Sequence, residues 1–112
     1  MRHSTNPALK WLPGILLAAL SAAGTANAAA PDVIATKAGC IACHTPKKKL
    51  VGPSYHDIAV KYHADAKAPA ALAAKVRSGG AGNWGKVKML PIDSKKITDA
   101  DLAAVVAWIL KQ

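Results

Sequence analysis

The sequence predicts an all-α domain, and three observations support that prediction. No segment alternates apolar and polar residues in the manner of a half-buried strand. Four segments carry apolar side chains at helical spacing, and each is bounded by capping or turn residues. The chain has no internal repeat, and its 112 residues suffice for one small domain. We therefore expect four to five short helices.

The first two expected helices lie in the half of the domain that comes first along the chain. One covers residues 32–42, with Val33, Ile34, Lys37 and Ile41 at helical spacing. The next begins at Ser54, because Ser54 and Asp57 together resemble a capping box. Its apolar stripe follows an i, i+3, i+4, i+7 pattern and consists of Tyr55, Ile58, Ala59 and Tyr62.

The third expected helix begins near residue 68, because Pro69 suits the first helical position. Leu72 and Val76 lie on one face of it, and a Ser-Gly-Gly sequence ends it. Residues 79–96 then read as a long, glycine-rich loop. A loop of that length in so small a domain usually has a specific role.

The fourth expected helix has the clearest signals. Thr98 can cap its start, and Asp99 and Asp101 complement the positive end of the helix dipole. Lys111 lies at the negative end. The predicted buried stripe consists of Leu102, Val105, Val106 and Ile109, with Trp108 beside it.

Residues 1–28 have the organisation of a secretory signal peptide. A basic start without acidic residues precedes an apolar stretch, and the small residues Ala-Asn-Ala at 26–28 match a cleavage site. We expect cleavage after Ala28, since a cut after Ala30 would leave Pro31 just past the scissile bond. A permanent membrane anchor is the alternative, but the apolar stretch is shorter than the ~20 residues of a span.

Residues 29–112 form the expected mature domain, which is exported to the periplasm without stable membrane insertion. This segment keeps thirteen of the fifteen basic residues and all six acidic ones, a formal net charge of +7. Export argues against nucleic acid as the partner of this positive charge. The segment has no Phe, two Trp and two Tyr, so large side chains for a core are scarce. A domain this small often needs a disulfide, a metal or a cofactor.

Cys40, Cys43 and His44 form a Cys-Ile-Ala-Cys-His sequence, the attachment motif of haem c. The spacing places the two thiols to react with two neighbouring vinyl groups of the porphyrin. The histidine that follows then coordinates the iron from the same side. These are the only cysteines of the chain, and we expect one covalent haem c.

Three other interpretations of the cysteine pair are weaker. A thioredoxin-like redox pair would need a βαβ scaffold, and the sequence shows no strand. A disulfide between residues so close in sequence would constrain almost nothing. A zinc site would lack ligands at the usual spacing.

Met89 is the expected second axial ligand. It is the only methionine outside the signal peptide, and it lies on the long loop, far along the chain from His44. A thioether favours Fe(II), so His/Met ligation raises the reduction potential. The alternatives are a core-filling role for Met89, ligation by His56 or His63, or an open site that permits gas binding or peroxide chemistry.

The sequence resembles the class I c-type cytochromes, specifically the small bacterial monohaem electron carriers of the c-551 type. The resemblance covers nearly all of the mature chain. The matching features, in the family's order, are Gly39, the Cys40–His44 motif, Val51-Gly52-Pro53, Tyr55, Asp57, Gly82-Asn83-Trp84-Gly85, Met89 and the last helix.

The resemblance implies a class I cytochrome c fold, with the helices wrapped around one covalently bound haem. It implies that the carbonyl of Pro53 accepts a hydrogen bond from the ring of His44. It places Trp84 and Lys75 near the haem propionates. It also places Gly39 where the first and last helices cross, because a residue without a side chain lets Trp108 pack closely there.

Departures from the family pattern lie around Met89. Lys88 and Leu90 stand where the family often has proline, and Ile92 stands where an asparagine often approaches the methionine sulfur. We therefore expect a looser loop around Met89 and a sulfur with fewer hydrogen bonds.

The resemblance also implies the function: a monomeric electron carrier, not an enzyme, between a membrane respiratory donor and a terminal acceptor such as an oxidase or nitrite reductase. Basic residues near the exposed haem edge would steer it onto acidic patches of redox partners. These are Lys47, Lys48, Lys49, Lys86 and Lys88, although lysine runs are often only a solvated face. The alternatives are a cytochrome subunit of a periplasmic oxidoreductase complex, or a haem peroxidase or gas sensor if Met89 is not a firm ligand.

Overall fold

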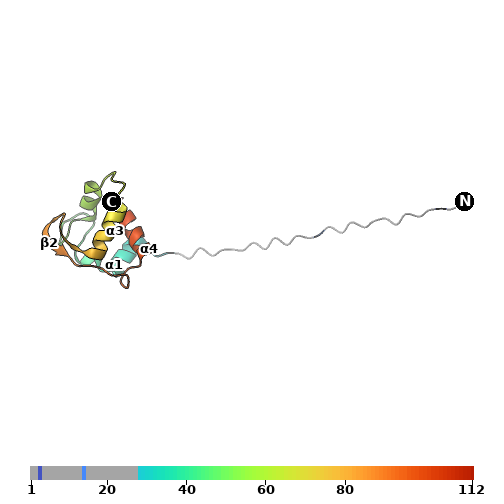
Figure 1. Ribbon diagram of the computed structural model, residues 1–112, viewed down its shortest axis with the longest axis horizontal. Helices are drawn as coiled ribbons and strands as arrows, with labels where there is room; N and C mark the ends of the chain where they lie inside the picture. Colours follow the sequence, from blue (N-terminus) through green and yellow to red (C-terminus); the bar gives the residue numbers. More distant parts are fainter. Residues whose placement is uncertain (1–2, 4–13, 15–27) are drawn as a thin grey trace.

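Four α-helices and one β-hairpin make up the folded part of the chain in the computed structural model (Figure 1). The structure describes His3, Gly14 and residues 28–112, so the expected signal peptide lies almost wholly outside the described residues. In chain order the elements are α1 (Pro31–Lys37), a 3₁₀ turn (Cys40–Ala42), α2 (Tyr55–Lys61), α3 (Ala68–Ser78), β1 (Gly80–Gly82), β2 (Gly85–Met89) and α4 (Asp99–Ile109). The predicted all-α class is confirmed, with a small hairpin added to it.

The predicted capping residues Ser54 and Thr98 are confirmed at the N-termini of two helices. The side-chain oxygen of Ser54 accepts a hydrogen bond from the backbone N–H of Asp57 at 3.0 Å, at the start of α2. The hydroxyl of Thr98 accepts one from the N–H of Asp101 at 3.2 Å, at the start of α4. Each cap satisfies a backbone donor that the helix itself leaves free.

The first helix is shorter than expected. α1 ends at Lys37 rather than continuing to residue 42, because Gly39 has φ +87°, outside the helical region. The expectation that Gly39 allows close packing of Trp108 is wrong. A Cβ on Gly39 would meet no atom within 4 Å, so the left-handed backbone accounts for the glycine.

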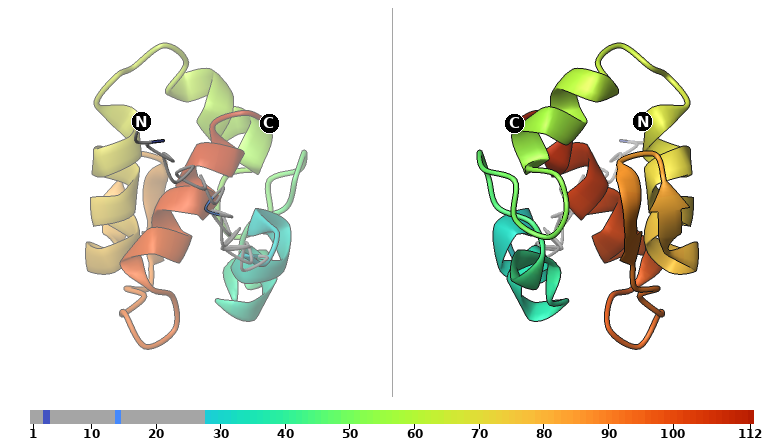
Figure 2. Two further views of the ribbon diagram at one scale, coloured as in Figure 1. Left: turned by 90° about the vertical axis from the view of Figure 1, so that its right-hand side faces the viewer. Right: turned by 90° about the vertical axis from the view of Figure 1, so that its left-hand side faces the viewer.

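The hydrophobic core lies where α4 crosses α1 and packs against α3 (Figure 2). Trp108 of α4 meets the ring of Tyr55 edge-on, with 5.1 Å between centroids, which links α4 to α2. Leu72 and Val76 of α3 are only half-buried, because they also border a cavity. The buried residues of this core are Ile34, Ala35, Ala38, Ile97, Leu102, Val105 and Val106.

The prediction of one long loop over residues 79–96 is wrong in its first half. Strands β1 and β2 pair there in antiparallel fashion, Gly80 with Met89 and Gly82 with Gly85, with an irregularity between. Nearly all of the hairpin is exposed, so its sequence has no need for the apolar alternation that reveals a half-buried strand.

Within residues 28–112, none of the helices has both the length and the apolar character needed to cross a membrane.

Candidate functional site

A cavity of about 630 Å³ lies between two walls of the molecule. One wall is the segment from Ala38 to Ile58, and the other is α3 with the hairpin and the residues that follow it. Part of the floor comes from α4, through Val105, Val106 and Ile109. The volume lies in the range of about 300–1,000 Å³ that holds small molecules and cofactors. The domain has few large apolar side chains to fill its interior, and a cavity occupies that place instead.

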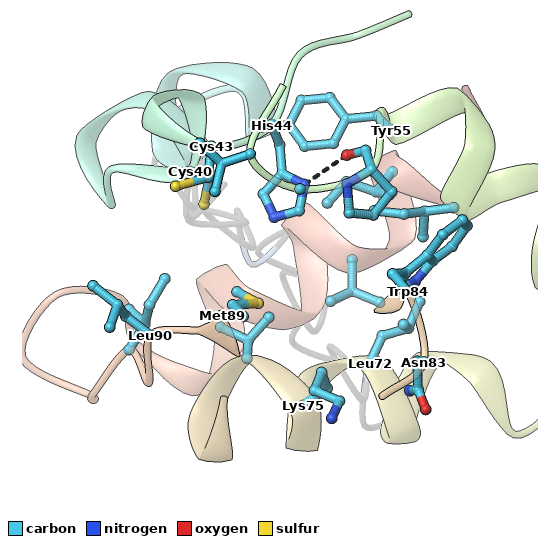
Figure 3. Close-up of a pocket in the computed structure, with 18 of the residues that line it drawn as sticks. Cys40, Cys43, His44, Tyr55, Leu72, Lys75, Asn83, Trp84, Met89 and Leu90 are labelled. Carbon is cyan, nitrogen blue, oxygen red and sulfur yellow. Dashed lines mark hydrogen bonds between the residues drawn. The ribbon is translucent and has the colours of Figure 1, made fainter. Parts of the chain in front are cut away.

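The two cysteines and the histidine of the motif share one wall (Figure 3). The 3₁₀ turn Cys40–Ala42 and the residues after it bring Cys40, Cys43 and His44 to the cavity. Both thiols are free and half-buried. Burial raises the pKa of the Cys40 thiol, partly opposed by a backbone hydrogen bond, so the group stays protonated at neutral pH.

His44 is held in one orientation by its neighbours. Its Nδ1 lies 2.7 Å from the carbonyl oxygen of Pro53. A carbonyl only accepts, so Nδ1 carries the proton and the Nε2 lone pair is free to bind a metal. A Cβ on Gly52 would lie 2.6 Å from Cε1 of His44, and the ring of Tyr55 stacks on the imidazole with 5.9 Å between centroids.

Met89 lies on the opposite wall, across the cavity from His44 (Figure 3). It is half-buried at the base of β2. Gly79, with φ +63°, is buried against this segment, and a Cβ there would collide with the carbonyl oxygen of Met89. Beyond it, the N–H of Ile92 donates to the carbonyl of Val76 at 3.0 Å.

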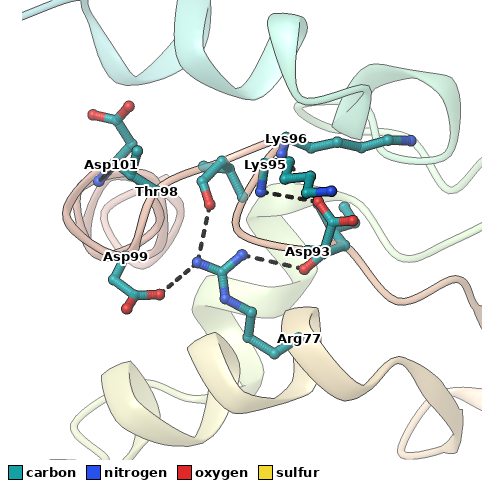
Figure 4. Close-up of polar contacts among 9 residues, drawn as sticks. Arg77, Asp93, Lys95, Lys96, Thr98, Asp99 and Asp101 are labelled. Carbon is teal, nitrogen blue, oxygen red and sulfur yellow. Dashed lines mark hydrogen bonds and ion pairs between the residues drawn. The ribbon is translucent and has the colours of Figure 1, made fainter.

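Arg77 of α3 anchors the chain that follows Met89 (Figure 4). Its guanidinium donates to the carbonyl oxygens of Ile92 at 3.2 Å and Ile97 at 2.9 Å. It also forms an ion pair with Asp99 at 2.6 Å. The role of Arg77 is not evident from the sequence, since nothing local distinguishes an arginine that binds distant carbonyls.

The two histidines weighed as alternative ligands lie elsewhere. His56 of α2 and His63, just after it, are both exposed. Neither of them lines the cavity. Met89 is therefore the candidate ligand that the fold brings opposite His44.

The third group of predicted site residues lies along one edge of the cavity. Trp84 and Lys75 both line it, and neither side chain has a hydrogen-bond or ion-pair partner among the described residues. Their N–H donors are thus available to an acidic group. Asn83, beside Trp84, lines the cavity too (Figure 3), a position that its sequence context did not predict.

Tyr55 carries a second feature that the sequence did not reveal. Its hydroxyl is buried, and no described residue forms a hydrogen bond with it. Burial raises the pKa of Tyr55 to about 12, and the nearby Cys40 adds to the shift. The neutral phenol is therefore strongly favoured in the folded state.

The mouth of the cavity combines positive charge with exposed apolar side chains. Lys49, Lys88 and Lys96 line the cavity and are exposed to solvent. Three large aliphatic side chains that line the cavity are also exposed to solvent: Val51, Val87 and Leu90.

Haem c fits the residues present. Two thiols and an imidazole with a free lone pair share one wall, and a thioether faces them from the other. The interior between them is mostly apolar, and donors without partners lie at one edge.

Comparison with known proteins gives consistent matches. The family model described as Cytochrome c matches residues 28–112. Cytochrome c2 of Rubrivivax gelatinosus is 52% identical over 83 residues, which cover 74% of this chain and 98% of that protein. Cytochrome c-551 of Allochromatium vinosum is 48% identical over 84 residues, covering 75% of this chain and 87% of that protein.

Solved structures agree with the fold. The crystal structure of wild-type Nitrosomonas europaea cytochrome c552 is similar, with a TM-score of 0.65 and 41% identity. The match covers 71% of this chain and 96% of that one. A class 1 cytochrome from Sideroxydans lithotrophicus has a TM-score of 0.64 at 30% identity, covering 72% of this chain and 90% of that one.

Proposed function

This chain belongs to the cytochrome c family, and we propose that it is a periplasmic one-electron carrier with His44 and Met89 as the axial ligands of its haem iron. The family match and the relatives confirm three predictions made from the sequence: the class I c-type cytochrome fold, the covalent haem c, and electron transfer in place of enzymatic catalysis. The finer statements below are proposals.

One observation carries the ligation proposal: His44 and Met89 approach the cavity from opposite walls (Figure 3). When bound, haem c supplies a one-electron Fe(III)/Fe(II) couple. Protein ligands on both faces leave no position for a gas or a peroxide, which restricts the site to electron transfer. The soft, neutral thioether of Met89 favours the reduced state and raises the potential.

Other residues tune and enclose the site. The carbonyl of Pro53 accepts a hydrogen bond from the Nδ1–H of His44, which would make the imidazole a stronger electron-pair donor to the iron. The free donors of Trp84 and Lys75 suit the two propionates. The apolar lining limits the entry of water, so that little solvent rearranges when the charge of the iron changes.

The basic mouth of the cavity supports a proposal about partners. As a c-type cytochrome the protein exchanges electrons with other redox proteins. We propose that, as a monomer, it docks with the cavity mouth facing acidic patches on a membrane respiratory donor and on a terminal oxidase or reductase. The side chains that steer it are Lys47, Lys48, Lys49, Lys86 and Lys88, all exposed. Raising the ionic strength should then slow electron transfer.

The proposal of export rests on residues 1–28. The family match begins at residue 28 and the first helix at Pro31, which supports a mature domain that starts after Ala28. The mass of the protein recovered from the periplasm, compared with that of residues 29–112 plus one haem, tests both the cleavage site and the cofactor.

The ligation proposal is tested by optical spectra of the haem-loaded protein when oxidised, reduced and exposed to carbon monoxide. We expect a low-spin spectrum with the weak red-edge band of Met-to-Fe(III) ligation, unchanged by carbon monoxide. Met89→Ala should lose that band and bind carbon monoxide. A high-spin or carbon-monoxide-binding parent would remove Met89 as a ligand and favour a peroxidase or a gas sensor.

A further inference from the structure

The tip of the hairpin has little of its own structure to hold it in place. Both strands are exposed except for Met89, β1 is short and glycine-rich, and its pairing with β2 is irregular. Glycine weakens a strand, and an isolated two-stranded hairpin is marginally stable in water. The turn residues Asn83 and Trp84 lie at the end of the hairpin farthest along the strands from Met89. Something outside the hairpin must fix this end.

Lys61, the last residue of α2, contacts both turn residues. Its Nζ donates a hydrogen bond to the carbonyl oxygen of Asn83 at 2.6 Å. The same Nζ lies 4.3 Å from the centroid of the Trp84 ring, well within the ~6 Å of a cation–π interaction. One ammonium group thus engages both the backbone and a side chain at the hairpin tip.

These contacts join the two walls of the cavity. α2 belongs to the His44 wall, because its first residue, Tyr55, stacks on the His44 ring. The hairpin belongs to the opposite wall, because β2 ends at Met89. Within residues 28–112, no other hydrogen bond, ion pair or cation–π contact links α2 to the hairpin.

We propose that Lys61 is a latch that fastens the hairpin tip to α2 and thereby limits opening of the Met89 wall. Lys61 does not line the cavity, so it is a positioning residue that acts through the hairpin. It keeps Trp84 at the cavity edge and restrains the strand that carries Met89. The inference rests on the proposed function in one respect: the latch affects the iron only if Met89 is a ligand.

The test uses the haem-loaded protein and three variants. Lys61→Met keeps a long unbranched side chain but removes the cation and its donors, whereas Lys61→Arg keeps both. Lys37→Met is the matched control, because Lys37 is also the exposed last residue of a seven-residue helix. The Lys37 side chain makes no hydrogen bond, ion pair or cation–π contact in the described part of the chain.

The first measurement is amide hydrogen exchange by NMR. In Lys61→Met, the amides of residues 80–89 should exchange roughly 5- to 30-fold faster than in the parent, the factor that corresponds to a contact of this kind. The amides of α1 and α4 should not change. Lys61→Arg should resemble the parent more than it resembles Lys61→Met, and Lys37→Met should match the parent.

The second measurement is the rate at which added imidazole displaces the sixth ligand of the oxidised iron. That rate should rise in Lys61→Met with the hairpin exchange, while the denaturant midpoint of the whole domain stays near that of Lys37→Met. If Lys61 only stabilised the whole domain, the denaturant midpoint of Lys61→Met would fall, and the rate of imidazole binding would rise only as far as that loss of global stability requires. That result would contradict the proposal.

Equal hairpin exchange in Lys61→Met and Lys37→Met would overturn the latch, even in a protein whose spectrum shows Met89 on the iron. Fast exchange in both Lys61 variants would overturn it too, since the arginine keeps the cation. A parent spectrum without Met89 ligation would instead overturn the proposed function, and the hydrogen-exchange result would still decide on the latch.

Discussion

The two walls of the cavity depend on contacts that span very different distances along the chain. On the first wall, the hydrogen bond that orients His44 reaches Pro53, nine residues away. On the second, the hydrogen bonds of Arg77 reach Ile92 and Ile97, 15 and 20 residues away. The contact that orients His44 thus lies within one short segment, whereas the contacts of Arg77 form only when α3, the chain after the hairpin and the start of α4 have come together. The difference predicts that Met89 ligation is the more easily broken of the two.

The largest effect is expected from Gly79→Ala on the Met89 wall. Its φ of +63° is costly for any residue with a side chain, and the new Cβ would collide with the carbonyl oxygen of Met89. The free energy of unfolding should fall by about 2–4 kcal/mol, and the Met-to-Fe(III) band should weaken. Denaturant titration of the oxidised holoprotein measures the first and its optical spectrum the second.

Gly82→Ala is the control for Gly79→Ala. Gly82 has φ +119°, but a Cβ there would meet no atom within 4 Å, so this variant has the backbone strain without the collision. An equal loss of stability in both variants would contradict the view that close packing against Met89 explains Gly79.

Arg77→Met should have the next largest effect. It removes the donors to the carbonyls of Ile92 and Ile97, and the loss of such charged hydrogen bonds should lower the free energy of unfolding by about 2 kcal/mol. Asp99→Asn isolates the ion pair. Because Asp99 is 93% exposed, that variant should lose less than about 1 kcal/mol. Equal losses, compared by denaturant titration, would mean that the ion pair and not the backbone contacts stabilises this segment.

Gly52→Ala tests the His44 wall. A Cβ 2.6 Å from Cε1 forces the imidazole to turn, which weakens its hydrogen bond to Pro53 and costs about 1 kcal/mol. With less electron density donated to the iron, the reduction potential should rise, as measured by redox titration. Pro53→Ala keeps the backbone carbonyl and should shift the potential less. Equal shifts would show that the carbonyl bond is not the cause.

The smallest effect is expected from Tyr55→Phe, and only at high pH. Because burial raises the pKa of Tyr55 in the folded state, the unfolded chain ionises first, from its ordinary pKa near ~10. The stability contributed by the neutral phenol is therefore complete below about pH 10 and is lost as the pH rises toward 12. The variant should match the parent at pH 7 and lose less stability between pH 10 and 12. Parallel curves for the two proteins would contradict the raised pKa.

Local sequence signals predicted the helices well. The caps at Ser54 and Thr98 are where the sequence placed them, because a cap depends on residues three apart. The end of α1 was misplaced, since the sequence alone does not show that Gly39 adopts φ +87°. The hairpin was missed because an exposed strand needs no apolar alternation.

The site residues also differ in whether local sequence signals or distant contacts determine their roles. Cys40, Cys43 and His44 were evident from their spacing, which is itself the chemical requirement of the motif. Trp84 and Lys75 came from the family resemblance and not from any local pattern. The roles of Arg77 and Lys61 were invisible in the sequence, because their partners lie 15 to 22 residues away.

The difference in sequence separation between these contacts also affects the order in which they form during folding. A loop as short as the one between His44 and Pro53 closes on the order of 10–100 ns, so the first wall can form as soon as its own segment is free. The bonds of Arg77 to Ile97 and Asp99 must wait until the start of α4 has joined the fold. We therefore expect the hydrogen bond that orients His44 to form before the contacts that hold the chain after Met89.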